Sequence, residues 1–168
     1  MNSEIDPLII RDYDPVWAVL FADISNKIAT ALHSICVRIE HVGSTAVQGL
    51  AAKPIIDLDV VLPSSVEIPQ AIHLLAALGY VHEGDLGIHA REAFRWPPGE
   101  ARHHVYVLIE GAAELRRHMD FRDALRANAD LREEYARLKR SLAAQHSGNR
   151  DAYAKGKSAF IRAVIGPL

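Results

Sequence analysis

The sequence predicts an α+β fold: a mixed β-sheet of about five strands, with flanking helices and a C-terminal helical hairpin. Three observations lead to this prediction. Several short runs alternate apolar and polar residues, an apolar stripe recurs at helical spacing near the N-terminal end, and charge-rich helical patterning begins at Glu114. The 168 residues, of which 49% are hydrophobic and 24% charged, fit one domain with a core large enough to fold alone. We therefore expect a single domain over residues 1–168, with its helical part starting at about residue 114.

Two helices are expected in the first half of the chain. Asp14 supplies a capping carboxylate and Pro15 suits the first helical position, so the apolar stripe that follows predicts a helix over residues 15–33. Residues 66–78 carry a second apolar stripe. That helix is expected to stop at Gly79, because glycine readily adopts the conformation that ends helices.

Alternation of apolar and polar residues predicts the strands, and Pro97-Pro98-Gly99 predicts a turn before the last of them. Asn128 and Asn149 are expected helix caps, which divide the C-terminal part into two or three helices. The expected strands cover residues 37–42, 55–62, 80–82, 90–96 and 104–109.

Composition and charge exclude several classes of protein. A formal net charge of −2 gives no reason to expect nucleic acid or an anionic membrane as a partner. A single cysteine, Cys36, excludes an internal disulfide and a cysteine-based zinc site, and its apolar neighbours predict a buried side chain. The chain has no secretory signal pattern and no apolar run long enough to span a bilayer, so we expect a cytoplasmic protein.

A Gly-Ser turn followed by an Asp-x-Asp strand is the most informative feature for function. Gly43 lets the backbone approach an anion closely, and Ser44 adds a hydroxyl donor beside it. Residues two apart in a strand face the same side, so Asp57 and Asp59 are expected to present their carboxylates together. Paired carboxylates suit Mg²⁺, whose remaining ligands are usually phosphate oxygens and water.

The block that contains this feature resembles the signature run of the GrpB family. From Ile39 to Asp57 it reads Ile-Glu-His-Val-Gly-Ser-Thr-Ala-Val-Gln-Gly-Leu-Ala-Ala-Lys-Pro-Ile-Ile-Asp. Further matches extend the resemblance from Tyr13 to Ile161, nearly the whole chain. The resemblance implies the nucleotidyltransferase fold.

The resemblance also implies a site and a reaction. The ligand would be a nucleoside triphosphate bound with Mg²⁺, or Mn²⁺, and the reaction nucleotidyl transfer to a small molecule or a protein. Asp57 and Asp59 would hold the metal as the catalytic pair. An alternative is a catalytically degenerate protein that binds a nucleotide, a CoA-like ligand or another phosphorylated small molecule. The residues expected to hold phosphates are Gly43, Ser44, Thr45 and Lys53.

The third carboxylate of a usual nucleotidyltransferase site is missing. His104 and Tyr106 occupy the corresponding face of the strand over residues 104–109, so His104 is the expected third metal ligand. Restoring an acidic site would require Glu92 or Glu110 to reach Asp57. The other candidate site residues are His41, His103 and Tyr106.

The remaining charged residues give weaker signals. Arg91 and Arg95 share one side of a strand, for which a solvent-exposed face is the simplest interpretation. Five histidines have no partner pattern and are expected at the surface or at helix ends: His33, His73, His82, His118 and His146. The cations that could approach phosphates are Lys53, Arg91, Arg95 and Arg102 from the strand region, and Arg122, Lys139, Lys155 and Lys157 from the helices.

Overall fold

A computed structural model describes residues 8–166. Its helices and strands follow the expected order, and their ends lie within a few residues of the predicted ones. The elements are α1 (Val16–Ala31), β1 (Arg38–Val42), β2 (Ile56–Leu62), α2 (Ile68–Ala77), β3 (Val81–Gly84), β4 (Arg91–Arg95), β5 (His103–Ile109), α3 (Ala113–Ala127), α4 (Ala129–Gln145) and α5 (Arg150–Ile165), with short 3₁₀ turns η1 (Ser44–Ala46) and η2 (Ser65–Glu67).

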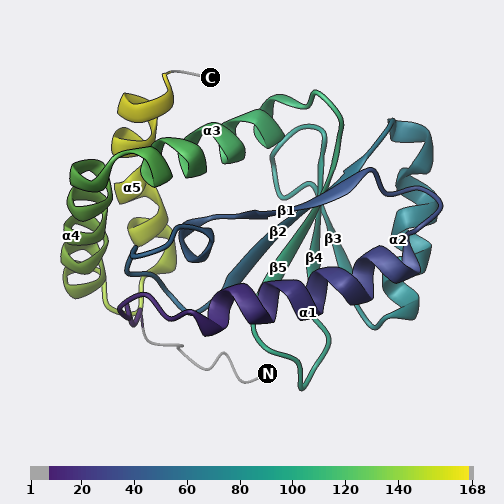
Figure 1. Ribbon diagram of the computed structural model, residues 1–168, viewed down its shortest axis with the longest axis horizontal. Helices are drawn as coiled ribbons and strands as arrows, with labels where there is room; N and C mark the ends of the chain where they lie inside the picture. The colour runs from purple at the N-terminus through teal and green to yellow at the C-terminus, as the bar shows by residue number, and fades with distance from the viewer. Residues whose placement is uncertain (1–7, 167–168) are drawn as a thin grey trace.

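The five strands form one mixed sheet in the order β1-β2-β5-β4-β3. The central pair β2–β5 is parallel, whereas β1–β2, β4–β5 and β3–β4 are antiparallel. This confirms the predicted α+β class and the mixed sheet. Within the described residues the C-terminal part is helical, and its helices α3 to α5 agree with the expected two or three, as Figure 1 shows.

One face of the sheet carries the main apolar core, beneath α1 and α2. The alternation along β2 sends Leu58 and Val60 to this face, where both are fully buried. From α1, Ile24 and Ile28 pack against the same cluster. Trp17 adds a large aromatic side chain at the start of that helix. The burial of these side chains supplies the hydrophobic stabilisation that holds α1 to the sheet.

The opposite face is covered by α3, which runs on the other side of the sheet from α1 (Figure 1). Leu115 packs on Val61 and Leu108, so part of this interface is apolar. Arg122 donates to the Glu40 carboxylate at 2.8 Å and to the His41 carbonyl at 3.1 Å. These bonds occupy its guanidinium, so Arg122 braces α3 against β1 and does not line the cavity described below.

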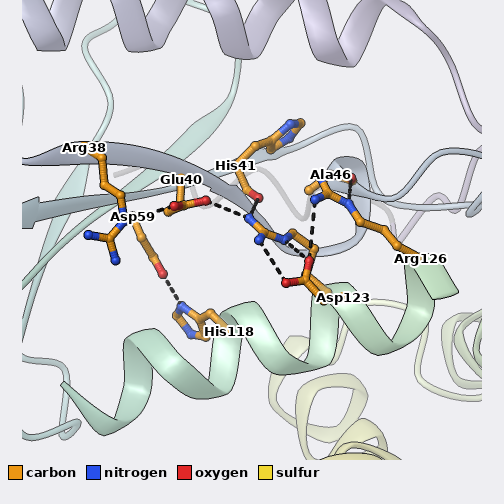
Figure 2. Close-up of polar contacts among 9 residues, drawn as sticks. Arg38, Glu40, His41, Ala46, Asp59, His118, Asp123 and Arg126 are labelled. Carbon is orange, nitrogen blue, oxygen red and sulfur yellow. Dashed lines mark hydrogen bonds and ion pairs between the residues drawn. The ribbon is translucent and has the colours of Figure 1, made fainter. Parts of the chain in front are cut away.

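Arg126 ties the same helix to the turn after β1. Its guanidinium donates twice to the Ala46 carbonyl oxygen, at 3.1 and 2.8 Å, as drawn in Figure 2. The turn η1 therefore has a fixed position relative to α3.

The last two helices close the structure beside η1. The expected caps are confirmed: Asn128 Oδ1 accepts from Leu131 N–H at 3.1 Å, and Asn149 Oδ1 accepts from Ala152 N–H at 3.0 Å. Asp14 likewise accepts from the Val16 N–H at the start of α1. Within residues 8–166 no helix is long and apolar enough to cross a membrane.

Candidate functional site

A cavity of about 480 Å³ opens where the polar face of the sheet meets the C-terminal helices. Its walls come from the β1–η1 turn, from β2, β4 and β5, and from α3, α4 and α5. Segments far apart in the chain thus meet in one site. Its polar and aromatic lining residues are Ser44, Thr45, Lys53, Asp57, Arg91, His104, Tyr106, Arg117, His118, Phe121, Tyr135, Lys139, Arg150, Tyr153 and Lys157.

The Gly-Ser turn lies directly over the first aspartate. Gly43 has φ 70° and ψ −170°, a conformation essentially restricted to glycine. A Cβ at this position would lie 2.4 Å from Asp57 Oδ2, so only a glycine backbone can approach the carboxylate this closely. On the other side, Asp57 Oδ1 lies 2.9 Å from His104 Nδ1, as their register in the parallel β2–β5 pair requires. The structure therefore brings Gly43, Ser44, Asp57 and His104 together, as strand parity predicts.

Asp59 does not face the open cavity, contrary to expectation. Asp59 is 0% exposed, and its Oδ2 lies 2.7 Å from His118 Nδ1 (Figure 2). Its Oδ1 is buried and has no hydrogen-bond partner. Burial raises the pKa of this carboxyl, and the His118 hydrogen bond opposes that rise.

His118 is not the surface residue that its lack of a partner pattern suggested. It lies on the sheet-facing side of α3, between Asp59 and Glu114, whose Oε1 is 3.1 Å from His118 Nε2. Burial disfavours charge on the imidazole, but hydrogen bonds to both carboxylates outweigh it and raise its pKa to about 9. The same contact holds the pKa of Glu114 below its usual range. A protonated His118 thus neutralises buried acidic charge beside the cavity.

The side chains as they lie do not fit the expected metal site. Within residues 8–166, no three His, Cys, Asp or Glu side chains converge closely enough to hold a metal ion. Asp59 is turned to His118, and Asp57 is bonded to His104. Neither candidate third acid reaches Asp57, because Glu92 Oε2 pairs with His82 at 2.6 Å and Glu110 pairs with Arg38.

Two lysines from the helices line the cavity, and one of them, Lys139, reaches the Gly-Ser turn. Lys139 of α4 is only 2% exposed and its Nζ lies 2.9 Å from Ser44 Oγ, with a second hydrogen bond to the Ala51 carbonyl. Burial lowers its pKa to about 7, with a further contribution from nearby Lys157. Burial also lowers the pKa of Lys157, whose Nζ lies 4.6 Å from the centre of the Tyr153 ring.

Three of the other candidates serve mainly the fold. Thr45 lines the cavity, but its hydroxyl donates to the Ile55 carbonyl at 3.2 Å and also contacts His41 Nε2 at 3.1 Å. His41 stacks on Phe21 on the α1 side of the sheet, and burial lowers its pKa to about 4. His103 faces the same side, where its Nε2 lies 2.7 Å from the Tyr80 hydroxyl.

The strand-region cations divide into two pairs. Lys53 and Arg91 line the cavity, and Arg91 is buried with its guanidinium 4.6 Å from the centre of the Tyr106 ring, so a solvent-exposed face is the wrong interpretation for it. Arg95 is exposed beside Glu83, and Arg102 lies over the Trp96 ring. Neither of that second pair reaches the cavity.

The residues that sequence reasoning missed or weighed lightly come from the helices. Helical spacing contained a signal for them. Glu114, His118 and Arg122 recur every four residues, and Leu115 and Leu125 share the buried face of α3. Lys139 stands four residues after Tyr135 and three before Leu142, on the buried face of α4. A charged residue at an apolar helix position indicates a specific use, because burying it unpaired is costly.

Comparison with known proteins agrees with this architecture. A family model described as GrpB protein matches residues 7–166. The chain belongs to the GrpB family. UPF0157 protein YqkA of Bacillus subtilis is 35% identical over 150 residues, which are 89% of this chain but only 44% of that relative. The chain thus spans less than half the length of YqkA.

Solved structures agree with a nucleotidyltransferase-like fold. The crystal structure of conserved protein GrpB from Enterococcus faecalis superposes with a TM-score of 0.85 at 33% identity, covering 93% of this chain and 94% of that one. A structure of Cid1 in complex with its short product ApU gives a TM-score of 0.56 at 14% identity, covering 77% of this chain and 42% of that one. The second likeness shows the fold alone, and it agrees with the nucleotidyltransferase-like sheet.

We predict that Gly43→Ala destabilises the protein by about 3 kcal/mol, because it combines a strained backbone with a methyl group pressed against Asp57. Gly49→Ala is the matched control, since Gly49 also has positive φ (81°) but open space around it. We expect it to cost about 1–2 kcal/mol. Urea unfolding of both variants measures the difference, and equal losses would show that the approach to Asp57 is unimportant.

We predict that His118→Gln removes a stabilisation that depends on pH. The folded-state pKa of about 9 lies above the ordinary 6.5, so protonated His118 contributes fully below about pH 6.5 and loses its contribution as the pH rises through about 9. The expected difference in unfolding free energy from wild type is on the order of 2–3 kcal/mol at pH 6 and shrinks by pH 10.

Urea unfolding at pH 6, 7.5, 9 and 10 tests this, with His73→Gln on the exposed side of α2 as control. The lowered pKa of Lys139 gives stability a slope of opposite sign above pH 7, but that slope is common to all three proteins and cancels in the difference. A difference that stays constant with pH would contradict a charged His118.

Proposed function

We propose that the protein binds a nucleotide or another phosphorylated small molecule in this cavity. The observation that carries the proposal is the charge of the lining. Among the described residues of the cavity wall, Asp57 is the only carboxylate. The basic residues there are Lys53, Arg91, Arg117, Lys139, Arg150 and Lys157. So strong an excess of positive charge inside a chain of net charge −2 favours a polyanionic ligand.

The lining also suits the two ends of such a ligand. Phosphates would lie at the Gly43–Thr45 turn, within reach of the Ser44 hydroxyl and of Lys139 and Lys157. The rings of Phe121 and Tyr135 offer an apolar surface for a base or another flat group. A volume of about 480 Å³ lies in the range of small-molecule sites. A CoA-like ligand shares the phosphate chemistry and is an alternative occupant.

Nucleotidyl transfer is a second candidate function. It is favoured by the likeness of the fold to the Cid1 poly(U) polymerase and by the position of Asp57 in the cavity wall. Magnesium binding by Asp57, Asp59 and His104 stays a prediction. The arrangement of these side chains in the described residues does not support it. We therefore derive no metal-dependent step. Arginine and lysine side chains can themselves offset charge on a transferring phosphoryl group.

We predict that ATP and inorganic pyrophosphate bind without a divalent metal, and that Lys157→Gln weakens both by about tenfold. Calorimetric titration in EDTA measures the affinities. Lys155→Gln is the matched control, because Lys155 lies on the same helix but is exposed and outside the cavity wall. Equal losses in the two variants would mean that the anions bind to general surface charge and would contradict the proposed cavity.

We predict that Asp57→Asn tightens nucleotide binding in EDTA by about threefold or more, since it removes the repulsive carboxylate from a cationic cavity. If Asp57 instead holds a metal ion, Asp57→Asn should weaken nucleotide binding in the presence of that metal. If Mg²⁺ strengthens binding to wild type, and Asp57→Asn loses that gain, then Asp57 is a metal ligand and the metal-free account is wrong. Parallel titrations with EDTA and with MgCl₂ distinguish metal-free nucleotide binding from binding through a metal held by Asp57.

A further inference from the structure

Ser44 lies between a buried amine, which can take its proton, and a phenol, which can only hydrogen-bond it. Lys139 Nζ lies 2.9 Å from Ser44 Oγ, and the Tyr135 hydroxyl also hydrogen-bonds the Ser44 side chain. All three side chains line the cavity, so the serine hydroxyl is accessible to a ligand while its partners are buried. A serine hydroxyl beside an amine that can accept its proton is an arrangement that makes serine nucleophilic.

The surroundings of Lys139 favour a neutral amine. It is 2% exposed, and its polar contacts are the Ser44 hydroxyl, the Ala51 carbonyl and the face of the Tyr135 ring, none of them a carboxylate. Burial, then the charges of Lys157 on α5 and Arg140 on α4, lower its pKa to about 7. A neutral amine can donate to Ala51 and still accept a proton from Ser44.

The neighbouring hydroxyl of the same turn lacks these properties. Thr45 donates to the Ile55 carbonyl and is shared with His41, so its proton and its lone pairs are committed to the fold. Of this pair, only Ser44 has a lysine amine beside it. The turn that would hold phosphates therefore also presents one activated oxygen to them.

We propose that Ser44 is a nucleophile, with Lys139 as its general base, and that it accepts a nucleotidyl group from a nucleoside triphosphate bound in the cavity. This rests on the proposed nucleotide binding and names the first acceptor of the group. Ser44 Oγ forms a bond to the α-phosphorus, and the bond from that phosphorus to the bridging oxygen of the β-phosphate breaks. Pyrophosphate leaves with the electron pair, and the serine proton passes to Lys139 Nζ. The charge that develops on the phosphates lies among Arg91, Arg117 and Lys157.

The test is incubation of the full chain with ATP or UTP, in EDTA and in MgCl₂, followed by intact-mass measurement, peptide mapping and a pyrophosphate assay. We expect one nucleotidyl group on Ser44 and one pyrophosphate released per chain, in at least one of the two conditions. The rate should rise with pH through about 7 as Lys139 loses its proton. The protonatable or charged groups packed around it, Tyr135, Arg140, Tyr153 and Lys157, are unchanged in every variant used.

The variants separate nucleophile, base and fold. Ser44→Ala should form no adduct but should still bind ATP, and Ser25→Ala, an exposed serine on α1, should behave as wild type. Lys139→Arg places a permanently charged guanidinium there, which cannot act as a base, so we expect at least a hundredfold slower labelling with ATP binding retained. Because Lys139 is buried, its variant is checked by thermal melting, and Ser44→Ala carries the test if Lys139→Arg does not fold.

Three outcomes overturn the proposal. A wild-type protein that binds ATP yet stays unlabelled in both conditions shows that Ser44 only holds phosphate, and it leaves the proposed function standing. Labelling that persists in Ser44→Ala, or maps to another residue, removes Ser44 as the acceptor. Absence of ATP binding to wild type refutes the proposed function and, with it, this reaction.

Discussion

A buried carboxylate needs a partner, and this constraint shapes the polar half of the molecule. Asp59 stands in the middle of the central strand with no exposed surface. Burial raises the pKa of this carboxyl, and α3 opposes that rise by bringing His118 to within 2.7 Å, while Glu114 contacts the same imidazole from that helix. The pairing draws α3 down onto the sheet. With α3 in place, Arg126 fixes the turn that carries Ser44, and α4 and α5 can close the cavity.

Local patterns in the sequence were enough to predict the sheet. Alternation along β2 and β5 put Asp57, His104 and Tyr106 on one face, and the register confirms this parity. Capping by Asn128 and Asn149 could also be predicted from the sequence, because each cap joins residues only three apart. Each of these features depends on neighbours in the chain or on a strand's own periodicity.

The parts that sequence reasoning missed depend on contacts between distant segments. Parity alone cannot tell whether Asp59 faces solvent or lies beneath a helix, and here the helix comes 59 residues later. The same holds for Lys139, which meets Ser44 across 95 residues. Helical spacing puts His118 and Lys139 on the buried faces of their helices. The docking of those faces on the rest of the structure, which decides the chemistry of these side chains, has no local signal. The likeness to the nucleotidyltransferase fold concerns only the backbone architecture. The chemistry of the cavity depends on these long-range contacts.

The alternation of β2 also protects the fold against misalignment. A slip of one residue against β5 would turn Asp57 and Asp59 into the apolar layer under α1 and expose Leu58 and Val60 in the cavity. Each of those errors is costly, so the charged residues make the correct alignment the only stable one. The acidic positions of this strand are therefore constrained twice, by their contacts with His104 and His118 and by the pairing they enforce. A descendant that binds nothing in the cavity would still be under pressure to keep them polar.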